Sequence, residues 1–170
     1  MIECKIYIYK EDYKYLQKYT VEWDFVNSDL LQKINQHLYD NCKYKLVHDN
    51  KYFKNHIPII IAITVDKYIV ATCEILYNLS YNLAEIYNIC VNIMYRKQGY
   101  VKKLLAFIFE FQYHLKCDLW IAVASTNPMY KIVNKIYMDA GFIDDVKINS
   151  ITPSGILYPD GFIEFYKRYK

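Results

Sequence analysis

The sequence predicts an α/β protein with a mixed sheet and helices on both faces, its elements in the order β-α-α-β-β-β-α-β-α-β-β. Some segments alternate apolar with polar residues or form short apolar runs, which is typical of strands. Others repeat apolar residues at helical spacing. A hairpin-rich first half leads into a strand-helix-strand-helix unit, which favours a mixed sheet. The 170 residues suffice for one core, so a single domain over residues 1–170 is expected.

The first half of the chain is expected to contain a strand, two helices and three strands. Ser28 or Asn27 is a suitable N-cap for the second helix. Asp66 and Lys67 fit a two-residue hairpin turn between the second and third strands. In order, these elements cover residues 2–8, 11–19, 28–41, 57–65, 68–77 and 84–95.

The second half is expected to contain a helix, a buried strand, a second helix and two strands. The second helix has Asn127 as its cap, Pro128 in its first turn and Gly141 at its end. A loop over residues 149–161 separates the last two strands. In order, the elements cover residues 101–116, 118–125, 127–140, 142–148 and 162–170.

Composition and charge exclude several classes of protein. The net charge of +3 is too weak to indicate a nucleic-acid ligand by itself. The N-terminus has no secretory apolar region, and no run of 18 apolar residues occurs, so a soluble cytoplasmic protein without a membrane segment is expected. The histidines lack paired-ligand spacing, so no metal site is expected. The cysteines are odd in number and widely spaced, which indicates no disulfide framework and fits a reducing compartment. They are Cys4, Cys42, Cys73, Cys90 and Cys117.

The stretch "YRKQGYVKKLL", residues 95–105, is the strongest candidate for a binding loop. Gly99 lets the backbone approach a ligand, and the free N–H groups at a helix start favour an anion. Taken alone, the stretch favours a solvated basic turn before a helix, because the pattern Arg-x-x-Gly is common. The amides that could hold a diphosphate belong to Gln98, Gly99, Tyr100, Val101 and Lys102, and the added positive charges to Arg96, Lys97, Lys102 and Lys103.

The run "AEIYNICVNIMYRKQGYVKKLL", followed by "LWIAVASTN" and "KIYMDAGF", resembles the central motifs of the GNAT superfamily of acetyl-CoA-dependent N-acetyltransferases. That family has a pyrophosphate loop Gln/Arg-x-x-Gly-x-Gly/Ala after a strand Leu-x-Val-x-Pro-x-Tyr. The matching residues are Ile89, Val91, Tyr95, Arg96 and Gly99.

The second motif of the family places a Tyr four residues before Gly-Phe, as Tyr137 stands before Gly141 and Phe142. The resemblance covers residues 84–142. It departs from the family pattern at Val101, where Gly or Ala is preferred and where the larger side chain is expected to push the loop outward or weaken cofactor binding. It also departs in the second helix, which has Tyr130 and Val133 at the family's Asn and Ala positions.

The resemblance implies acetyl-CoA as cosubstrate and a set of residues that bind it. A bulged strand at Ile89, Cys90 and Val91 would frame the pantetheine arm, and a free amide there would bond the thioester oxygen. Either Asn127 or Asn134 would contact that arm. The loop residues implied to bind the diphosphate are Arg96, Lys97, Gln98, Gly99, Tyr100, Val101 and Lys102.

The resemblance also implies the catalytic groups. Glu85, eleven residues before Arg96, is the candidate base, and Tyr137 is the candidate acid for the departing thiolate. Cys90 is a weaker candidate for a covalent route, because no His lies near it in the sequence and the family mostly transfers directly in a ternary complex.

The implied activity is acetyl transfer to a primary amine, in a small molecule or at a protein N-terminus or lysine. Two alternatives stay open: a non-catalytic CoA-binding or interaction module of the same fold, and an acetyltransferase toxin acting on aminoacyl-tRNA. The last would use the basic, aromatic stretch 42–56. A homodimer through the final strand is also open. Candidate acceptor contacts are Glu22 and Asp24 near Trp23, together with Tyr158 and Asp160 of the last loop.

Overall fold

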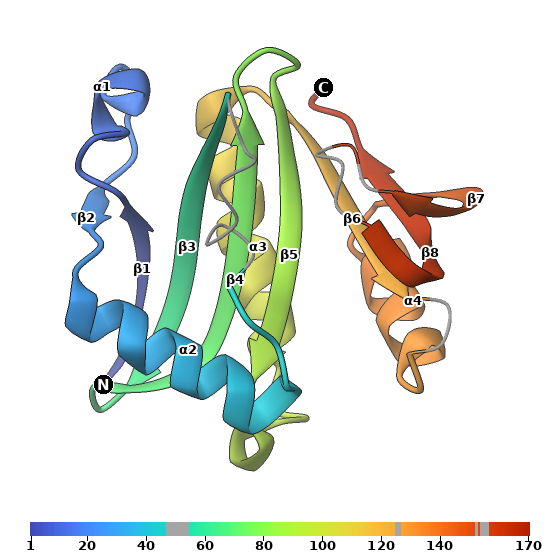
Figure 1. The fold of residues 1–170 in the computed structure, drawn as a ribbon, viewed down its shortest axis with the longest axis horizontal. Helices are drawn as coiled ribbons and strands as arrows, with labels where there is room; N and C mark the ends of the chain where they lie inside the picture. Colours follow the sequence, from blue (N-terminus) through green and yellow to red (C-terminus); the bar gives the residue numbers. More distant parts are fainter. Residues whose placement is uncertain (47–54, 125–126, 152, 154–156) are drawn as a thin grey trace.

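A computed structural model of the chain describes residues 1–46, 55–124, 127–151, 153 and 157–170. One eight-stranded sheet runs through the molecule, with helices on either side (Figure 1). The elements in order are β1 (Ile2–Ile8), α1 (Tyr13–Leu16), β2 (Trp23–Phe25), α2 (Ser28–Cys42), β3 (His56–Val65), β4 (Tyr68–Asn78), β5 (Leu83–Val91), the 3₁₀ helix η2 (Ile93–Tyr95), α3 (Tyr100–Leu115), β6 (Asp118–Ala124), α4 (Tyr130–Asp139), β7 (Ile143–Ile151) and β8 (Leu157–Lys167).

The predicted fold class is confirmed, with differences in detail. The strand β2 was not predicted, because a segment of three residues is too short to show a periodic pattern. It forms because it pairs in parallel with β1, with Ile6 opposite Trp23. The first helix has only four residues instead of the expected nine. The loop expected over 149–161 is largely replaced by the ends of β7 and β8, which extend toward each other as an antiparallel pair.

The strand order in the sheet is β2-β1-β3-β4-β5-β6-β8-β7. The strands β5 and β6 are parallel and lie near the middle, and antiparallel pairs flank them on both sides. The final strand β8 is therefore internal, between β6 and β7. This corrects the expectation that the final strand offers an edge to a second copy of the chain, because that edge belongs to β7.

Local sequence signals explain several element ends. The turn between β3 and β4 falls at Asp66 and Lys67, as predicted, and both take positive φ angles of 49° and 72°. The side chain of Asn27 caps α2 by accepting from the Leu30 amide at 2.8 Å. Beyond α4, Gly141 has φ +84°, a conformation suited to glycine at a helix end.

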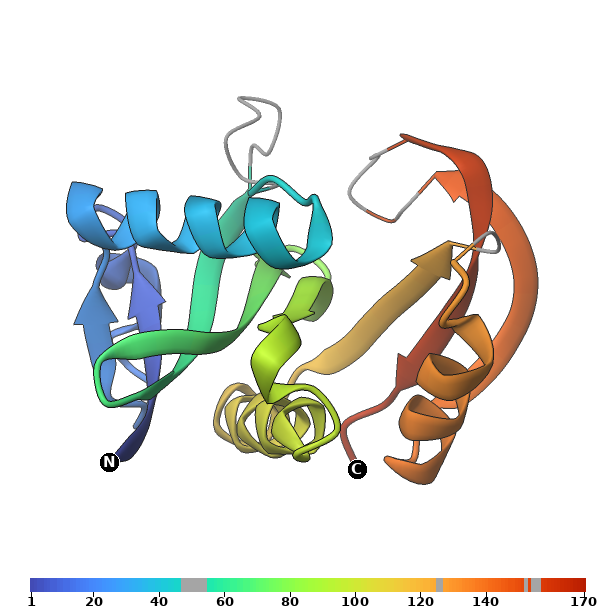
Figure 2. The same ribbon diagram turned by 90° about the horizontal axis from the view of Figure 1, so that it is seen from below.

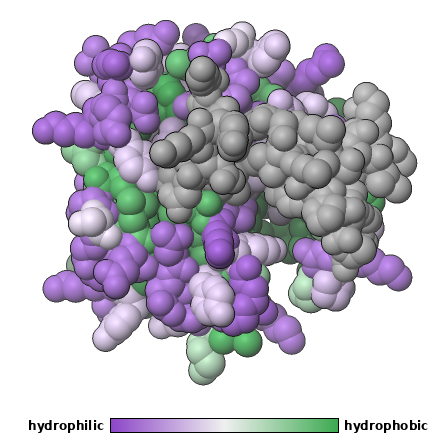
Figure 3. All heavy atoms as spheres, in the orientation of Figure 1, coloured by the Kyte–Doolittle hydropathy of each residue, from purple (hydrophilic) through white to green (hydrophobic). Residues whose placement is uncertain are grey.

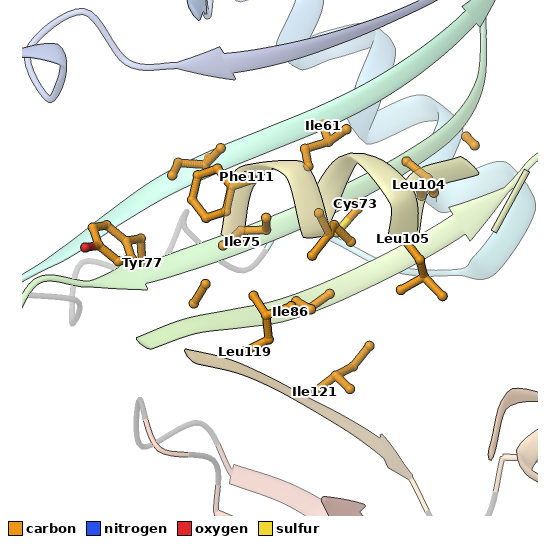
Figure 4. Close-up of a cluster of buried hydrophobic side chains, with 14 of the residues drawn as sticks. Ile61, Cys73, Ile75, Tyr77, Ile86, Leu104, Leu105, Phe111, Leu119 and Ile121 are labelled. Carbon is orange, nitrogen blue, oxygen red and sulfur yellow. The ribbon is translucent and has the colours of Figure 1, made fainter. Parts of the chain in front are cut away.

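The main core lies between the sheet and α3. Figure 4 shows Leu104, Leu105 and Phe111 of α3 against inward side chains of four central strands. On the opposite face, α2 packs Ile34 and Leu38 against Ile60 of β3. In Figure 2, α2 lies on one side of the sheet and α3 and α4 lie on the other, which matches the prediction of helices on both faces. On the face shown in Figure 3, hydrophilic side chains cover much of the coloured surface, with hydrophobic side chains visible between them. Among the described residues, no helix is both long and apolar enough to span a membrane.

Candidate active site

The strands β5 and β6 separate partway along their length. They pair from Leu83 with Asp118 to Ile86 with Ile121, and then stop pairing although β5 continues to Val91 and β6 to Ala124. Beyond this point β5 is irregular, because Asn88 has φ 51° and the register with β4 shifts. Among the described residues, the main-chain amides of β5 that face β6 beyond Ile86 therefore have no partner on β6.

The loop after β5 presents a row of main-chain donors. Lys97 and Gly99 have positive φ angles of 62° and 81°, and the helix α3 begins at Tyr100. In the described part of the chain, the amides of residues 97 to 102 donate to no protein acceptor. The helix start and its dipole favour negative charge at this point. The loop therefore has the chemistry of an anion site, and a diphosphate fits such a row of donors.

The side chain of Arg96 is committed to the protein. Its Nε donates to the Val91 carbonyl oxygen at 3.2 Å, and its Nη2 donates to the Asn41 carbonyl oxygen at 2.6 Å. The guanidinium thus ties the loop to the end of β5 and to the end of α2. Sequence reasoning gave Arg96 a place in the loop but missed this bracing, because its acceptor on Asn41 is 55 positions away.

The neighbouring loop residues divide into exposed and packed groups. Lys97, Gln98 and Lys102 are exposed, so their charges or amides face solvent. Tyr100 is buried and Val101 packs against the main core. The larger residue at Val101 is accommodated by this packing, which does not support the expectation that it pushes the loop outward.

The predicted cofactor-binding residues of β5 include a disulfide-bonded cysteine. Cys90 is buried and bonded to Cys42 at the end of α2, with Cα atoms 6.2 Å apart. This corrects the expectation of no disulfide framework. The two cysteines are 48 positions apart in the sequence, so their spacing gave no indication that they lie close together. The disulfide leaves Cys90 without a thiol for covalent catalysis. Ile89 is partly buried and Val91 is buried, and both pack in the main core.

The candidate base Glu85 lies on the α2 side of the sheet. Its Cα is paired with Leu76 on β4 and Trp120 on β6, and its side chain is fully buried. The Tyr87 hydroxyl donates to Glu85 Oε2 at 2.8 Å. His56 Nε2 lies 3.6 Å from Glu85 Oε1. Sequence reasoning missed His56, whose contact with Glu85 depends on the pairing of three strands.

The candidate acid Tyr137 lies on the opposite, α3 side. Its ring packs against Phe142 and Phe165, with ring centroids 5.8 Å and 5.5 Å away. Burial raises the pKa of Tyr137 well above the ordinary value for tyrosine. The hydroxyl therefore keeps its proton at neutral pH, which is the state that a proton donor needs.

The two asparagines near α4 make different contacts. The helix begins at Tyr130, later than the expected start at residue 127, because Asn127 Oδ1 accepts from the Met129 amide at 2.8 Å in a turn before it. Asn134 Nδ2 donates to the Tyr130 hydroxyl at 2.9 Å within the helix.

The candidate acceptor residues lie apart. Glu22 and Asp24 line a cavity of about 420 Å³ between β1, β2 and α3, on the face opposite Glu85. The positions of Tyr158 and Asp160 fall within β8. Most of the basic stretch 42–56, namely residues 47–54, lies outside the described residues.

Solved structures of low sequence identity share this fold. The Escherichia coli ribosomal-protein-S18-alanine N-acetyltransferase has a TM-score of 0.64 at 15% identity, over 85% of this chain and 91% of that one. Escherichia coli ElaA has a TM-score of 0.67 at 14% identity, over 99% and 100% of the two chains. A Bacillus subtilis acetyltransferase in complex with CoA has a TM-score of 0.60 at 15% identity, over 98% and 99%.

No curated protein matches the sequence significantly. The sequence profile of the Acetyltransferase (GNAT) family, however, matches residues 20–131, which is more than half of the chain. The matched region holds the anion-binding loop, the separated strands and Glu85. The family predicted from the two motifs is thereby confirmed, and the chain belongs to the GNAT family of acetyltransferases.

Proposed function

We propose that this protein transfers the acetyl group of acetyl-CoA, the typical cosubstrate of its family, to a primary amine by direct attack in a ternary complex. The observation that carries the proposal is the row of main-chain amides from residue 97 to residue 102 at the start of α3, which donate to no acceptor among the described residues. This row follows β5 and η2, and β5 stops pairing with β6 after Ile86. A diphosphate on the amides and a pantetheine arm between the strands fit this arrangement.

In this proposal the residues around the two strands hold the cosubstrate. The amides of Lys97 to Lys102 bind the diphosphate, and the exposed Lys97 and Lys102 add positive charge. Ile89, Cys90 and Val91 frame the arm, together with Asn127, whose side-chain oxygen accepts from the Met129 amide in the turn before α4. Asn134 is the weaker choice because its side-chain nitrogen bonds Tyr130.

The chemical step needs one proton removed and one supplied. Glu85 takes a proton from the acceptor ammonium, and the freed amine attacks the thioester carbonyl carbon. A β5 amide that faces β6 stabilises the charge on the carbonyl oxygen, an effect worth about 3 kcal/mol in a preorganised site. The carbon–sulfur bond breaks, and Tyr137 gives its proton to the thiolate.

The decisive experiment measures binding and turnover separately. Calorimetry with acetyl-CoA is expected to give a saturable isotherm, and no heat or thermal shift at millimolar acetyl-CoA would refute the cosubstrate site. A panel of amines is then assayed by thiol release, covering aminoglycosides, polyamines, amino sugars and peptide N-termini. Initial rates with both substrates varied should give intersecting lines, whereas parallel lines would contradict direct transfer. Binding without turnover on any amine would favour a non-catalytic CoA-binding module.

A further inference from the structure

The end of α2 is fastened to the end of β5 and to the loop that follows it. The helix runs across the strands, and its last residues lie beside the end of β5 (Figure 1). The Asn41 carbonyl oxygen accepts from Arg96 Nη2 at 2.6 Å, and Asn41 Oδ1 accepts from the Ile93 amide at 3.0 Å. The next residue, Cys42, is bonded through its sulfur to Cys90 of β5. Two consecutive residues of α2 therefore hold both the strand and the loop.

The segment of β5 that carries Cys90 is only partly restrained by the sheet. Pairing of β5 with β6 stops after Ile86. Asn88 has φ 51°, and the register with β4 shifts in the same region. Among the described residues, the strand partner of this segment is β4, with Thr72 opposite Cys90. The disulfide thus adds a covalent restraint where the hydrogen bonding of the sheet is incomplete.

The same segment belongs to the proposed acetyl-CoA site. In that proposal Cys90 and its neighbours frame the pantetheine arm, and Arg96 Nε donates to the Val91 carbonyl oxygen at 3.2 Å. Because Val91 follows Cys90 directly, a movement of Cys90 displaces the acceptor of Arg96. Arg96 also bonds Asn41, the residue before Cys42, so the disulfide and the guanidinium close one ring of contacts between α2 and the loop. A site held in its binding geometry loses less conformational freedom when a ligand binds.

The sulfur of Cys42 is the point at which a reductant attacks. Cys42 is partly exposed, whereas Cys90 is 0% exposed. The thiolate of a dithiol bonds to the Cys42 sulfur, the bond to Cys90 breaks, and Cys90 leaves as a thiolate that takes a proton. The second thiol of the reductant then displaces Cys42 from the mixed disulfide. Two electrons pass to the protein, and the dithiol is oxidised to a cyclic disulfide.

The other cysteines lie away from this pair. Cys4, Cys73 and Cys117 are free thiols. Cys73 and Cys117 belong to the main core on the α3 side of the sheet, and Cys4 packs against that core. Cys90 belongs instead to the cluster under α2, on the opposite face. Because the sheet separates them, reduction and reoxidation return the same disulfide.

We propose that the Cys42–Cys90 disulfide is a redox switch for the cosubstrate site. The disulfide form binds acetyl-CoA tightly, and a dithiol reductant lowers the affinity by freeing the end of α2 from β5. The inference rests on the proposed function, in which residues 89–102 hold acetyl-CoA. Coupling between two sites typically changes affinity by about 5- to 150-fold, and we expect about tenfold here. Coupling of this kind is reciprocal, so bound acetyl-CoA stabilises the disulfide by the same factor.

The first test is calorimetry with acetyl-CoA on the disulfide form and on protein reduced with a phosphine, at a temperature at which circular dichroism shows both forms to be folded. Reduction should raise Kd about tenfold and leave the number of sites per chain unchanged. Cys42→Ser should have the Kd of the reduced parent with and without the phosphine. Cys4→Ser is the matched control, because Cys4 is a free cysteine, and it should respond to reduction as the parent does.

The second test uses reciprocity, which a merely structural bond does not show. The protein is equilibrated in mixtures of reduced and oxidised dithiothreitol, without acetyl-CoA and with enough acetyl-CoA to saturate both forms. Alkylation of free thiols and mass spectrometry give the bonded fraction. A tenfold coupling makes the reduction potential about 30 mV more negative when acetyl-CoA is bound.

Three results would overturn the switch. They are equal Kd values for the two forms, a reduction potential that acetyl-CoA does not move, and a reduced chain that is unfolded at every temperature tested. In the last case the bond supports the fold as a whole and not the cosubstrate site. If the disulfide form binds no acetyl-CoA, the proposed cosubstrate site fails and the switch falls with it. If both forms bind acetyl-CoA equally, only the switch fails.

Discussion

Tyr87 donates a 2.8 Å hydrogen bond to Glu85 from only two positions along the same strand, so both side chains lie on one face of β5. The fully buried carboxylate is thereby held in one orientation. A fixed carboxylate beside the end of β5–β6 pairing is suited to removing a proton from an amine.

Glu85→Gln should lower turnover at neutral pH by about 100- to 10,000-fold, the usual contribution of a general base. The loss should shrink at alkaline pH, because more of the acceptor amine is already deprotonated there. Steady-state rates from pH 6 to pH 10 test this, with Glu110→Gln as control because Glu110 is exposed on α3. Full activity of Glu85→Gln at pH 7 would dismiss Glu85 as the base.

Tyr137→Phe should reduce kcat by about 100-fold with little change in KM for acetyl-CoA, because only the proton for the thiolate is lost. The ring contacts with Phe142 and Phe165 remain, so the melting temperature should change little. Since burial raises the pKa of Tyr137, its ionisation should not limit the parent activity until the pH is well above 10. A rate loss in the parent near pH 10 that Tyr137→Phe abolishes would contradict this.

Gly99→Ala should weaken acetyl-CoA binding about fivefold, because φ +81° costs a residue with a β-carbon roughly 1 kcal/mol. Within the described part of the chain, and apart from the two neighbouring residues, no atom lies within 4 Å of the added carbon, so no steric clash with the described residues adds to this cost. Gly141→Ala is the matched control, with φ +84° at the end of α4. Calorimetry should show weaker binding for Gly99→Ala only, while thermal melts show that Gly141→Ala is the less stable protein.

Arg96→Ala should destabilise the protein by about 1 to 3 kcal/mol, since it removes charged hydrogen bonds to the carbonyl oxygens of Val91 and Asn41. Acetyl-CoA binding should weaken as the loop loses its brace. Lys97→Ala should instead leave the melting temperature unchanged and weaken binding more at low salt than at high salt. If Arg96→Ala melts like the parent and shows only the salt-dependent loss, the guanidinium acts on the ligand and not on the loop.

Reduction of the Cys42–Cys90 disulfide should lower the free energy of unfolding by about 4 kcal/mol, as chain entropy predicts for a separation of 48 residues. For a chain of this length the melting temperature should fall by about 10 °C. Thermal melts with and without dithiothreitol measure this directly. Cys42→Ser should have the melting temperature of the dithiothreitol-treated parent under both conditions. An equal melting temperature of the parent with and without dithiothreitol would contradict the prediction.

Signals local in sequence predicted much of the fold and of the site. Helical spacing in residues 101–116 and the hairpin at Asp66 and Lys67 are properties of neighbouring residues, and the structure follows them closely. The same holds for the loop around Gly99, because its glycine, its basic residues and the helix after it are contiguous. These signals also sufficed for the family.

The weakest sequence predictions concern segments whose conformation depends on partners. Three residues at Trp23–Phe25 form a strand only because β1 lies beside them. The loop between the last two strands is shorter than the predicted residues 149–161, because β7 and β8 pair along most of their length. A short segment that becomes a strand by pairing with a neighbouring strand shows no periodic pattern in its own sequence.

By itself the sequence determined most of the order of the elements, the position of the loop around Gly99 and the family, because each depends on residue types within a few turns of chain. Only the tertiary structure decided that Arg96 braces α2, that Cys90 is bonded to Cys42 and that His56 contacts Glu85. Each of these contacts joins residues 29 to 55 positions apart, and a register shift in β3–β4 sets which side chain faces His56. These contacts arise from the pairing of strands and the packing of α2. Both bring together residues that are far apart in the sequence, and no local sequence pattern indicates such contacts.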